Sequence, residues 1–175
     1  EQALAHGLPD RAVDRLLAQR HWTGLGHGVY HASFLAPSWA ALVWAGVLIG
    51  GDAACAGGAA AAHLHGLLSQ PRTITILVPA TTRRPVADAR WEFVRTRRPL
   101  RSRGAPPRIG VEQAVLDLCG DPDLRLDRLV GLLADAVQQR LTTTPRLEQA
   151  LSGYARHPRR HQLREILGDV AVGAR

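Results

Sequence analysis

LPDRAVDRLLAQRHWTGLGHGVY, residues 8–30, passes from an amphipathic helix into a glycine-rich hairpin. Pro9 suits the first turn of a helix, and apolar side chains then recur on one helical face. The opposite face carries Arg11, Arg15 and Gln19, a row with i, i+4 spacing. Alternating glycines follow among residues that favour strands, which predicts two short strands joined by a turn. A helix followed at once by a hairpin is the element order of a winged helix-turn-helix.

In a winged helix-turn-helix, the second helix lies in the major groove of DNA and the hairpin touches the backbone or the minor groove. The sequence therefore supplies a set of candidate DNA-binding residues: Arg11, Arg15, Gln19, Arg20, His21 and His27. Arg and Gln side chains can bond base edges or phosphates. Asp10 and Asp14 put negative charge beside the same row, so an ordinary structural helix and hairpin remains the alternative.

Most of the basic charge lies further along the chain. The 175 residues have a formal net charge of +7, yet residues 1–71 carry three Arg against four acidic residues. Residues 72–108 carry ten Arg against two acidic residues and hold the excess. Such a block is typical of a surface that faces nucleic acid or an acidic protein, although a solvated sheet rim has the same composition. The candidates for partner or phosphate binding are Arg83, Arg84, Arg95, Arg97, Arg98, Arg101 and Arg103. The alternative function is therefore a protein-interaction module that docks an acidic partner on segment 83–108.

Periodicity predicts an α+β fold. Residues 37–50 and about 56–68 are expected as helices, because both stretches are apolar or Ala-rich and long enough. TITILVP (73–79) has the length and β-branched content of a buried strand, and RWEFVRTR (90–97) alternates as a half-exposed strand does. The Arg- and Pro-rich residues 97–108 predict an exposed basic loop, and helices fill the remainder.

Three parts are expected along the chain. They are a winged helix-turn-helix at 1–35, a mixed α/β domain at 36–121, and a helical segment at 122–175 that packs on it. The uncharged stretch 34–51 is interrupted by Pro and Gly and lacks a close basic flank. These features favour a buried core helix over a membrane span.

The residue types exclude several kinds of chemistry. The chain has no Lys, so it has no Walker A lysine and no lysine Schiff base, and the HExxH and GxSxG motifs are absent. His63 and His65 diverge on a helix, and a proline interrupts the pair His157 and His161. Asp117 is interpreted as a buried or capping carboxylate. The sequence thus predicts no enzyme, no metal and no cofactor.

Cysteine usage gives the expected compartment. Cys55 and Cys119 lie far apart without a CxxC pattern, and no secretory signal is found. Two small buried thiols in a reducing cytosol are the expectation.

The residues also resemble a known family. QALAHGLPDRAVDRLLAQRHWTGLGHGVY (2–30) is similar to the N-terminal winged-helix segment of AbiEi-type antitoxins and related transcriptional regulators. AAAAHLHGL (59–67), TITILVP, VEQAVLDLC (111–119) and LREILGDVAVGAR (163–175) resemble successive landmarks of that family.

The resemblance implies a cytoplasmic, bacterial, non-enzymatic regulator of type IV toxin–antitoxin systems or of orphan type. Its N-terminal module would bind double-stranded operator DNA, and a cognate toxin would be a possible partner. The resemblance also implies that the first helix of the winged module belongs before Glu1, so that the module is truncated. The Vsr-like endonuclease domain of longer relatives is not expected.

Overall fold

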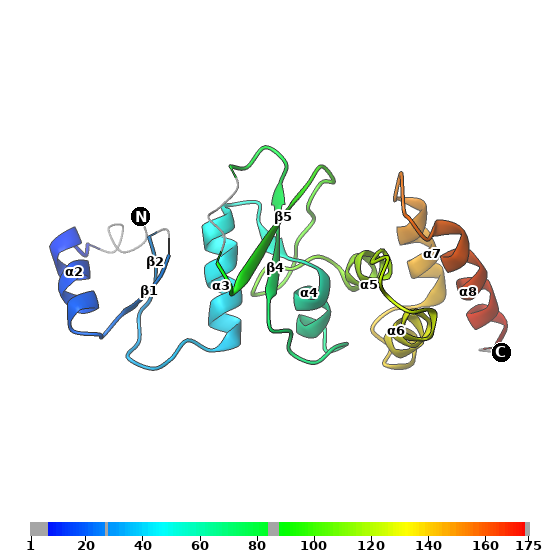
Figure 1. The fold of residues 1–175 in the computed structure, drawn as a ribbon, viewed down its shortest axis with the longest axis horizontal. Helices are drawn as coiled ribbons and strands as arrows, with labels where there is room; N and C mark the ends of the chain where they lie inside the picture. The colour runs from blue at the N-terminus through cyan, green and yellow to red at the C-terminus, as the bar shows by residue number, and fades with distance from the viewer. Residues whose placement is uncertain (1–6, 27, 84–87, 174–175) are drawn as a thin grey trace.

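The computed structural model describes residues 7–26, 28–83 and 88–173, and helices alternate with two small sheets along them. The elements follow in the order α2 (Asp10–Ala18), β1 (Thr23–Gly26), β2 (Val29–His31), α3 (Trp39–Gly50), β3 (Cys55–Ala56), α4 (Gly58–Leu64), β4 (Ile74–Pro79), β5 (Trp91–Thr96), α5 (Val111–Cys119), α6 (Leu126–Gln138), α7 (Thr144–Ser152) and α8 (Arg160–Gly173). Figure 1 shows α2 and the β1–β2 hairpin at one end, the larger sheet in the middle and α5 to α8 at the other end. The chain is an α+β protein.

Strand β4 is the centre of the larger sheet, antiparallel to β3 and parallel to β5. Successive side chains of a strand point to opposite faces, so Ile74, Ile76 and Val78 enter one core cluster and Leu77 enters another. Helices α3 and α4 both pack on β4, and Figure 1 shows them on its two sides. Burial on both faces explains why TITILVP is a nearly continuous apolar run.

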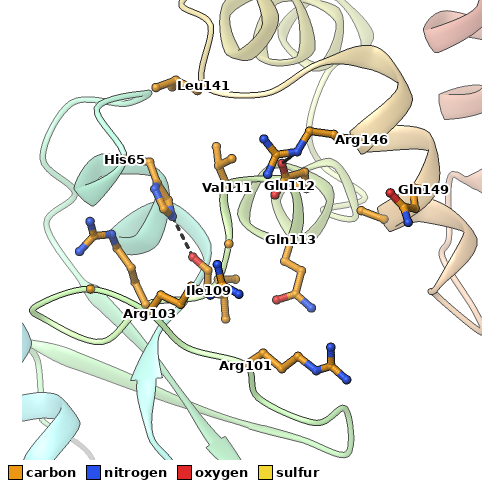
Figure 2. Close-up of a pocket in the computed structure, with 14 residues that line it drawn as sticks. His65, Arg101, Arg103, Ile109, Val111, Glu112, Gln113, Leu141, Arg146 and Gln149 are labelled. Atoms are coloured by element: carbon orange, nitrogen blue, oxygen red, sulfur yellow. Dashed lines mark hydrogen bonds and ion pairs between the residues drawn. The ribbon is translucent and has the colours of Figure 1, made fainter.

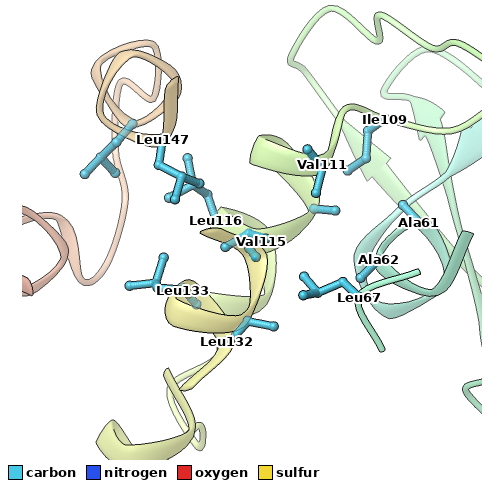
Figure 3. Packing of buried hydrophobic residues seen from close by; sticks show 14 of the residues in the cluster. Ala61, Ala62, Leu67, Ile109, Val111, Val115, Leu116, Leu132, Leu133 and Leu147 are labelled. Atoms are coloured by element: carbon cyan, nitrogen blue, oxygen red, sulfur yellow. The ribbon is translucent and has the colours of Figure 1, made fainter. Parts of the chain in front are cut away.

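Helix α5 is the middle of the larger core cluster. Figure 3 shows Val115 and Leu116 of α5 between Ala62 of α4 and the leucines Leu133 and Leu147 of α6 and α7. The α4 side chains at this contact are alanines without exposed surface, so the two helices approach closely. Each fully buried leucine stabilises the fold by about 1.5–3 kcal/mol.

A polar network joins the end of β5 to the C-terminal helices. The Arg98 guanidinium donates to both carboxylate oxygens of Asp117 on α5, at 2.9 and 2.8 Å. The Tyr154 hydroxyl donates to the same carboxylate at 2.8 Å, and the Arg98 Cζ lies 4.5 Å from the Tyr154 ring centroid. Burial and the facing carboxylate raise the pKa of Tyr154 above its ordinary value. Asp117 is therefore part of a structural network, as expected for a partly buried carboxylate.

The hairpin packs on the other core cluster. Leu25 is buried in the cluster of α3, β4 and β5, and β2 lies against α3. Trp91 of β5 donates its ring N–H to the Leu42 carbonyl at 2.8 Å, which fixes α3 on the sheet. A Cβ on Gly46 would lie 2.6 Å from the Trp91 Cδ1, so this close approach requires glycine. The predicted domain boundary at residue 35 stays a prediction. Leu25, which precedes this boundary, shares one hydrophobic cluster with residues that follow it.

Most expected elements are confirmed, with two differences. The Ala-rich helix is shorter than 56–68, because Cys55–Ala56 forms strand β3 against β4 before α4 begins. A two-residue strand has no periodicity to reveal it. The apolar helix begins at Trp39, because the Ser38 hydroxyl accepts from the Ala41 N–H at 3.2 Å and caps it. Among the described residues, every helix is too short or too polar to cross a membrane.

Candidate nucleic-acid interface

Helix α2 presents the polar row that the sequence predicted. Arg11, Arg15 and Gln19 are all exposed, whereas Val13 on the other face is 6% exposed. Alternation of this kind follows from the 3.6-residue repeat, which separates apolar and polar positions onto opposite faces. The row is therefore accessible along the whole helix.

The end of α2 is a Schellman motif. The Arg20 N–H donates to the Leu17 carbonyl at 3.0 Å, and the His21 N–H donates to the Leu16 carbonyl at 2.9 Å. Arg20 adopts φ 57°, in the left-handed region where glycine is usual. The motif turns the chain sharply and leaves Arg20 and His21 exposed beside the helix.

The hairpin follows at once. Its antiparallel register pairs Thr23 with His31 and Gly24 with Tyr30, and an irregularity follows at Leu25. Gly26 and Gly28 at the tip have φ of 116° and 74°, so the turn depends on glycine. His27 at the same tip lies outside the described residues.

Two contacts fix the hairpin relative to the sheet. The Leu25 side chain of β1 is buried, and the Leu25 carbonyl accepts a hydrogen bond from Arg90 Nη2 at 3.1 Å. Arg90 also binds both oxygens of Asp88, at 2.9 and 2.8 Å. These bonds lower the pKa of Asp88 from 3.8 to about 2. Sequence reasoning missed this positioning role, because the contact joins residues 65 apart in the chain.

Acidic side chains reduce the charge of the helix surface. Asp10 and Asp14 are exposed on α2, and neither forms an ion pair with any described Arg. Residues 7–26 thus hold three Arg against two Asp. The local potential is weakly positive, so bulk attraction of a polyanion must come from other parts of the chain.

The predicted basic segment divides into exposed and engaged residues. Arg83, Arg95, Arg97, Arg101 and Arg103 are exposed, and Arg84 lies outside the described residues. Arg98 was expected to be available for partner or phosphate binding, but its guanidinium is paired with Asp117. Burial alone would lower the pKa of Arg98, yet its bonds to Asp117 raise it overall. Several arginines lie close together in this part of the sequence, and the sequence does not indicate which of them forms an ion pair.

Two further arginines were missed as candidates. Arg108 and Arg146 lie with Arg101 and Arg103 around one cleft, although Arg146 is 38 or more residues from the others. Only the packing of α7 beside the start of α5 brings it there.

The histidines singled out in the sequence have structural partners. His63, His65 and His157 each place a ring nitrogen 2.8–2.9 Å from a backbone carbonyl. His161 lies 3.4 Å from Glu165 on the exposed side of α8. Within the described ranges, no three His, Cys, Asp or Glu side chains gather as a metal site would require. Cys55 and Cys119 are buried free thiols, as expected.

Comparisons with family models, with curated proteins and with solved structures found no match to this chain.

Proposed function

We propose that this chain is a non-enzymatic regulator that binds double-stranded DNA through α2 and the β1–β2 hairpin. The two elements would act as the recognition helix and wing of a winged helix-turn-helix. The observation that carries the proposal is the exposed row Arg11, Arg15 and Gln19 on a helix that leads directly into a hairpin. Neither Arg11 nor Arg15 forms an ion pair with any described residue, so both guanidinium groups are available to bond a ligand.

The chemistry of the row suits a major groove. An Arg fork can bond the O6 and N7 of guanine, a Gln amide can bond adenine, and both can bond phosphate. One helical turn separates Arg11 from Arg15 and Arg15 from Gln19, so all three side chains extend from the same face. Arg20 and His21 follow at the helix end, where they would meet the DNA backbone.

The hairpin is anchored firmly enough to hold a defined orientation. Burial of Leu25 and the bond from Arg90 to its carbonyl tie the strand to the sheet. Preorganised elements lose less conformational entropy on binding than mobile ones. The exposed arginines Arg83, Arg95 and Arg97 would add long-range attraction, which compensates for the weak charge of α2.

Titration of promoter duplexes with the full chain at several salt concentrations tests the proposal. A protein that neutralises several phosphates loses affinity with salt, by a slope of about 0.9 per phosphate in logarithmic units. The double variant Arg11→Gln/Arg15→Gln should weaken binding by about 30-fold or more, because each placed Arg contributes about 1–3 kcal/mol at a base edge. Arg156→Gln/Arg164→Gln is the matched control, since it also removes two exposed arginines and both lie at the opposite end of the molecule from α2.

Two outcomes would overturn the proposal. Binding that does not respond to salt would mean that no phosphates are neutralised. Equal losses in the α2 double variant and in Arg156→Gln/Arg164→Gln would mean that charge alone matters and that α2 reads nothing.

A protein-interaction module remains the alternative function, with the exposed part of segment 83–108 docking an acidic partner. Charge reversal at Arg95 and Arg97 separates the two functions, and Arg98 is left unchanged because it bonds Asp117. Loss of a protein partner with DNA binding intact favours the alternative. Uniform weakening on all DNA sequences favours a phosphate-contacting role.

The antitoxin part of the proposal is supported by the resemblance of residues 2–30, 59–67, 111–119 and 163–175 to AbiEi-type regulators. A toxin gene beside the gene of this chain, together with rescue of growth on co-expression, would support an antitoxin. A chain that binds its promoter without rescuing growth would be an orphan regulator.

A further inference from the structure

A cleft of about 610 Å³ lies where the α/β part of the chain meets the C-terminal helices. Its walls are the loop 101–110, the first turn of α5, one side of α7 and the end of α4 at His65. Figure 2 shows Arg101 and Arg103 on the loop, with Arg146 and Gln149 reaching in from α7 across the start of α5. The volume is in the range of sites that hold small organic ligands.

The lining of the cleft is strongly basic. Among the described residues that line it, four are arginines, namely Arg101, Arg103, Arg108 and Arg146, and Glu112 is the single acidic one. Arg146 Nε bonds Glu112 at 3.0 Å, and Thr142 donates to the same carboxylate oxygen at 2.8 Å. Glu112 is therefore already satisfied by the protein. The other three guanidinium groups form no ion pair with any described residue, so the cleft has an uncompensated charge of about three.

Backbone geometry places two of these arginines opposite each other. Arg103 and Arg108 exchange N–H to carbonyl bonds of 3.0 Å each, so they are directly opposed across a short antiparallel bridge. Opposed residues send their side chains to the same face, and like charges in that position destabilise the pair. The Arg108 Nη1 donates to the Pro106 carbonyl, yet its Nε is buried without a partner among the described residues. An anion between the guanidiniums would offset their like charges.

The start of α5 adds donors of the same kind. Gly110 is the N-cap residue and contributes no side-chain bond, and residues 110–113 line the cleft, so the N-terminal end of the helix lies at its wall. The positive end of a helix favours negative charge, and the effect adds to that of the arginines. Glu112 lies close to this helix end and competes for part of the same space.

One wall of the cleft is apolar. Leu141, Val111 and Ala150 supply its apolar lining, and Figure 2 shows Leu141 and Val111 apart from Arg101. A ligand that matches both walls carries several negative charges at one end and a flat or apolar body at the other.

We propose that the cleft between loop 101–110 and α5–α7 binds a small polyphosphorylated molecule of nucleotide size. Guanidinium forks bind phosphate bidentately, and three uncompensated cations suit a di- or triphosphate better than a single carboxylate. This site is separate from α2 and the hairpin, so the test of the cleft does not depend on the proposed DNA function.

Thermal unfolding and calorimetric titration of the full chain test the site with two probes, inorganic tripolyphosphate and a nucleoside triphosphate. A ligand held at about 100 times its Kd should raise the unfolding temperature by about 5–10 °C. The nucleotide should bind more tightly than tripolyphosphate, because only the nucleotide covers the apolar wall. Arg101→Gln and Arg103→Gln should each weaken binding of both probes by about tenfold.

The controls make each outcome decisive. Arg101 and Arg103 are exposed and their side chains form no bond with the described residues, so their loss should not destabilise the fold. Arg164→Gln removes one exposed cation elsewhere and should leave probe binding unchanged. Absence of a shift with both probes at millimolar concentration would overturn the proposal, as would an equal loss in Arg164→Gln. If only a DNA duplex binds and Arg101→Gln weakens it, the cleft holds backbone phosphate and the small-molecule site is refuted.

Discussion

Replacement of Arg20 by glycine separates the stability of α2 from its proposed contact with DNA. Arg20 occupies the left-handed position of a Schellman motif at φ 57°, with both backbone bonds of the motif formed. The position favours glycine for its conformation, and the arginine side chain is exposed. Arg20→Gly should therefore improve the helix end while it removes one cation.

The size of the gain follows from two opposing contributions. The left-handed region costs a residue with a Cβ about 1–2 kcal/mol, and glycine loses about 0.5–1 kcal/mol more chain entropy on folding. The net stabilisation is about 0.5–1 kcal/mol, which raises the unfolding temperature of a chain of this length by about 1–4 °C. If Arg20 contacts a phosphate, the same change lowers the salt slope of DNA binding by about 0.9.

Arg140→Gly is a matched control. Arg140 also has φ 57°, and the bonds Arg140 N–H to Val137 carbonyl and Leu141 N–H to Ala136 carbonyl, at 2.9 and 3.1 Å, form the same motif after α6. Both variants should unfold at a higher temperature and slow amide exchange in the preceding helix. Only Arg20→Gly should lose DNA affinity.

Two results would refute the reasoning about Arg20. A lower unfolding temperature for Arg20→Gly, with a higher one for Arg140→Gly, would mean that the Arg20 side chain stabilises the fold through contacts that outweigh its backbone strain. An unchanged salt slope in the more stable Arg20→Gly variant would remove Arg20 from the DNA interface.

Three other predictions concern the core and the hairpin anchor. Asp117→Asn leaves the half-buried Arg98 without its carboxylate and should destabilise the fold by about 2 kcal/mol in denaturant titrations. Burial raises the pKa of Cys55 to about 11 and that of Cys119 to about 12, so a thiol reagent at pH 8 should react only at the rate of unfolding. The Asp88 pair with Arg90 contributes fully above pH 3.8 and is lost as the pH falls toward about 2, since the folded pKa is the lower one. Asp88→Asn should flatten the stability profile in that window, by less than about 1 kcal/mol because solvent screens the pair.

Each of these predictions has a contrary outcome. Asp127→Asn breaks the exposed pair of Arg125 and Asp127 and is the control for Asp117, with an expected loss of under about 1 kcal/mol. Equal effects of the two substitutions would mean that the Asp117 network is no stronger than a surface pair. Fast labelling of the native thiols would contradict their burial. An acid profile identical in Asp88→Asn and the parent would exclude Asp88 as the source of the acid sensitivity.

The sequence alone determined the features that depend on local pattern. Spacing of 3.6 residues placed Arg11 and Arg15 on one face of α2, and alternating glycines placed the hairpin directly after it. The β-branched run of β4 and the alternation of Trp91 and Phe93 in β5 gave strands whose burial matches the structure. These features follow from sequence because a helix or strand exposes its periodicity within a few neighbouring residues.

Only the tertiary structure decided which charged groups are paired and which converge. Arg98 and Arg101 look alike in sequence, yet the first meets Asp117, 19 residues away, and the second faces an open cleft. Strand β3 forms only because β4 offers an edge, and Arg146 joins the loop arginines only because α7 packs beside α5. Partners of this kind are separated by many residues, and the sequence around a charged residue does not indicate which residue it will contact. Local periodicity thus fixed the elements, and long-range packing fixed the electrostatics of the cleft and the anchor of the hairpin.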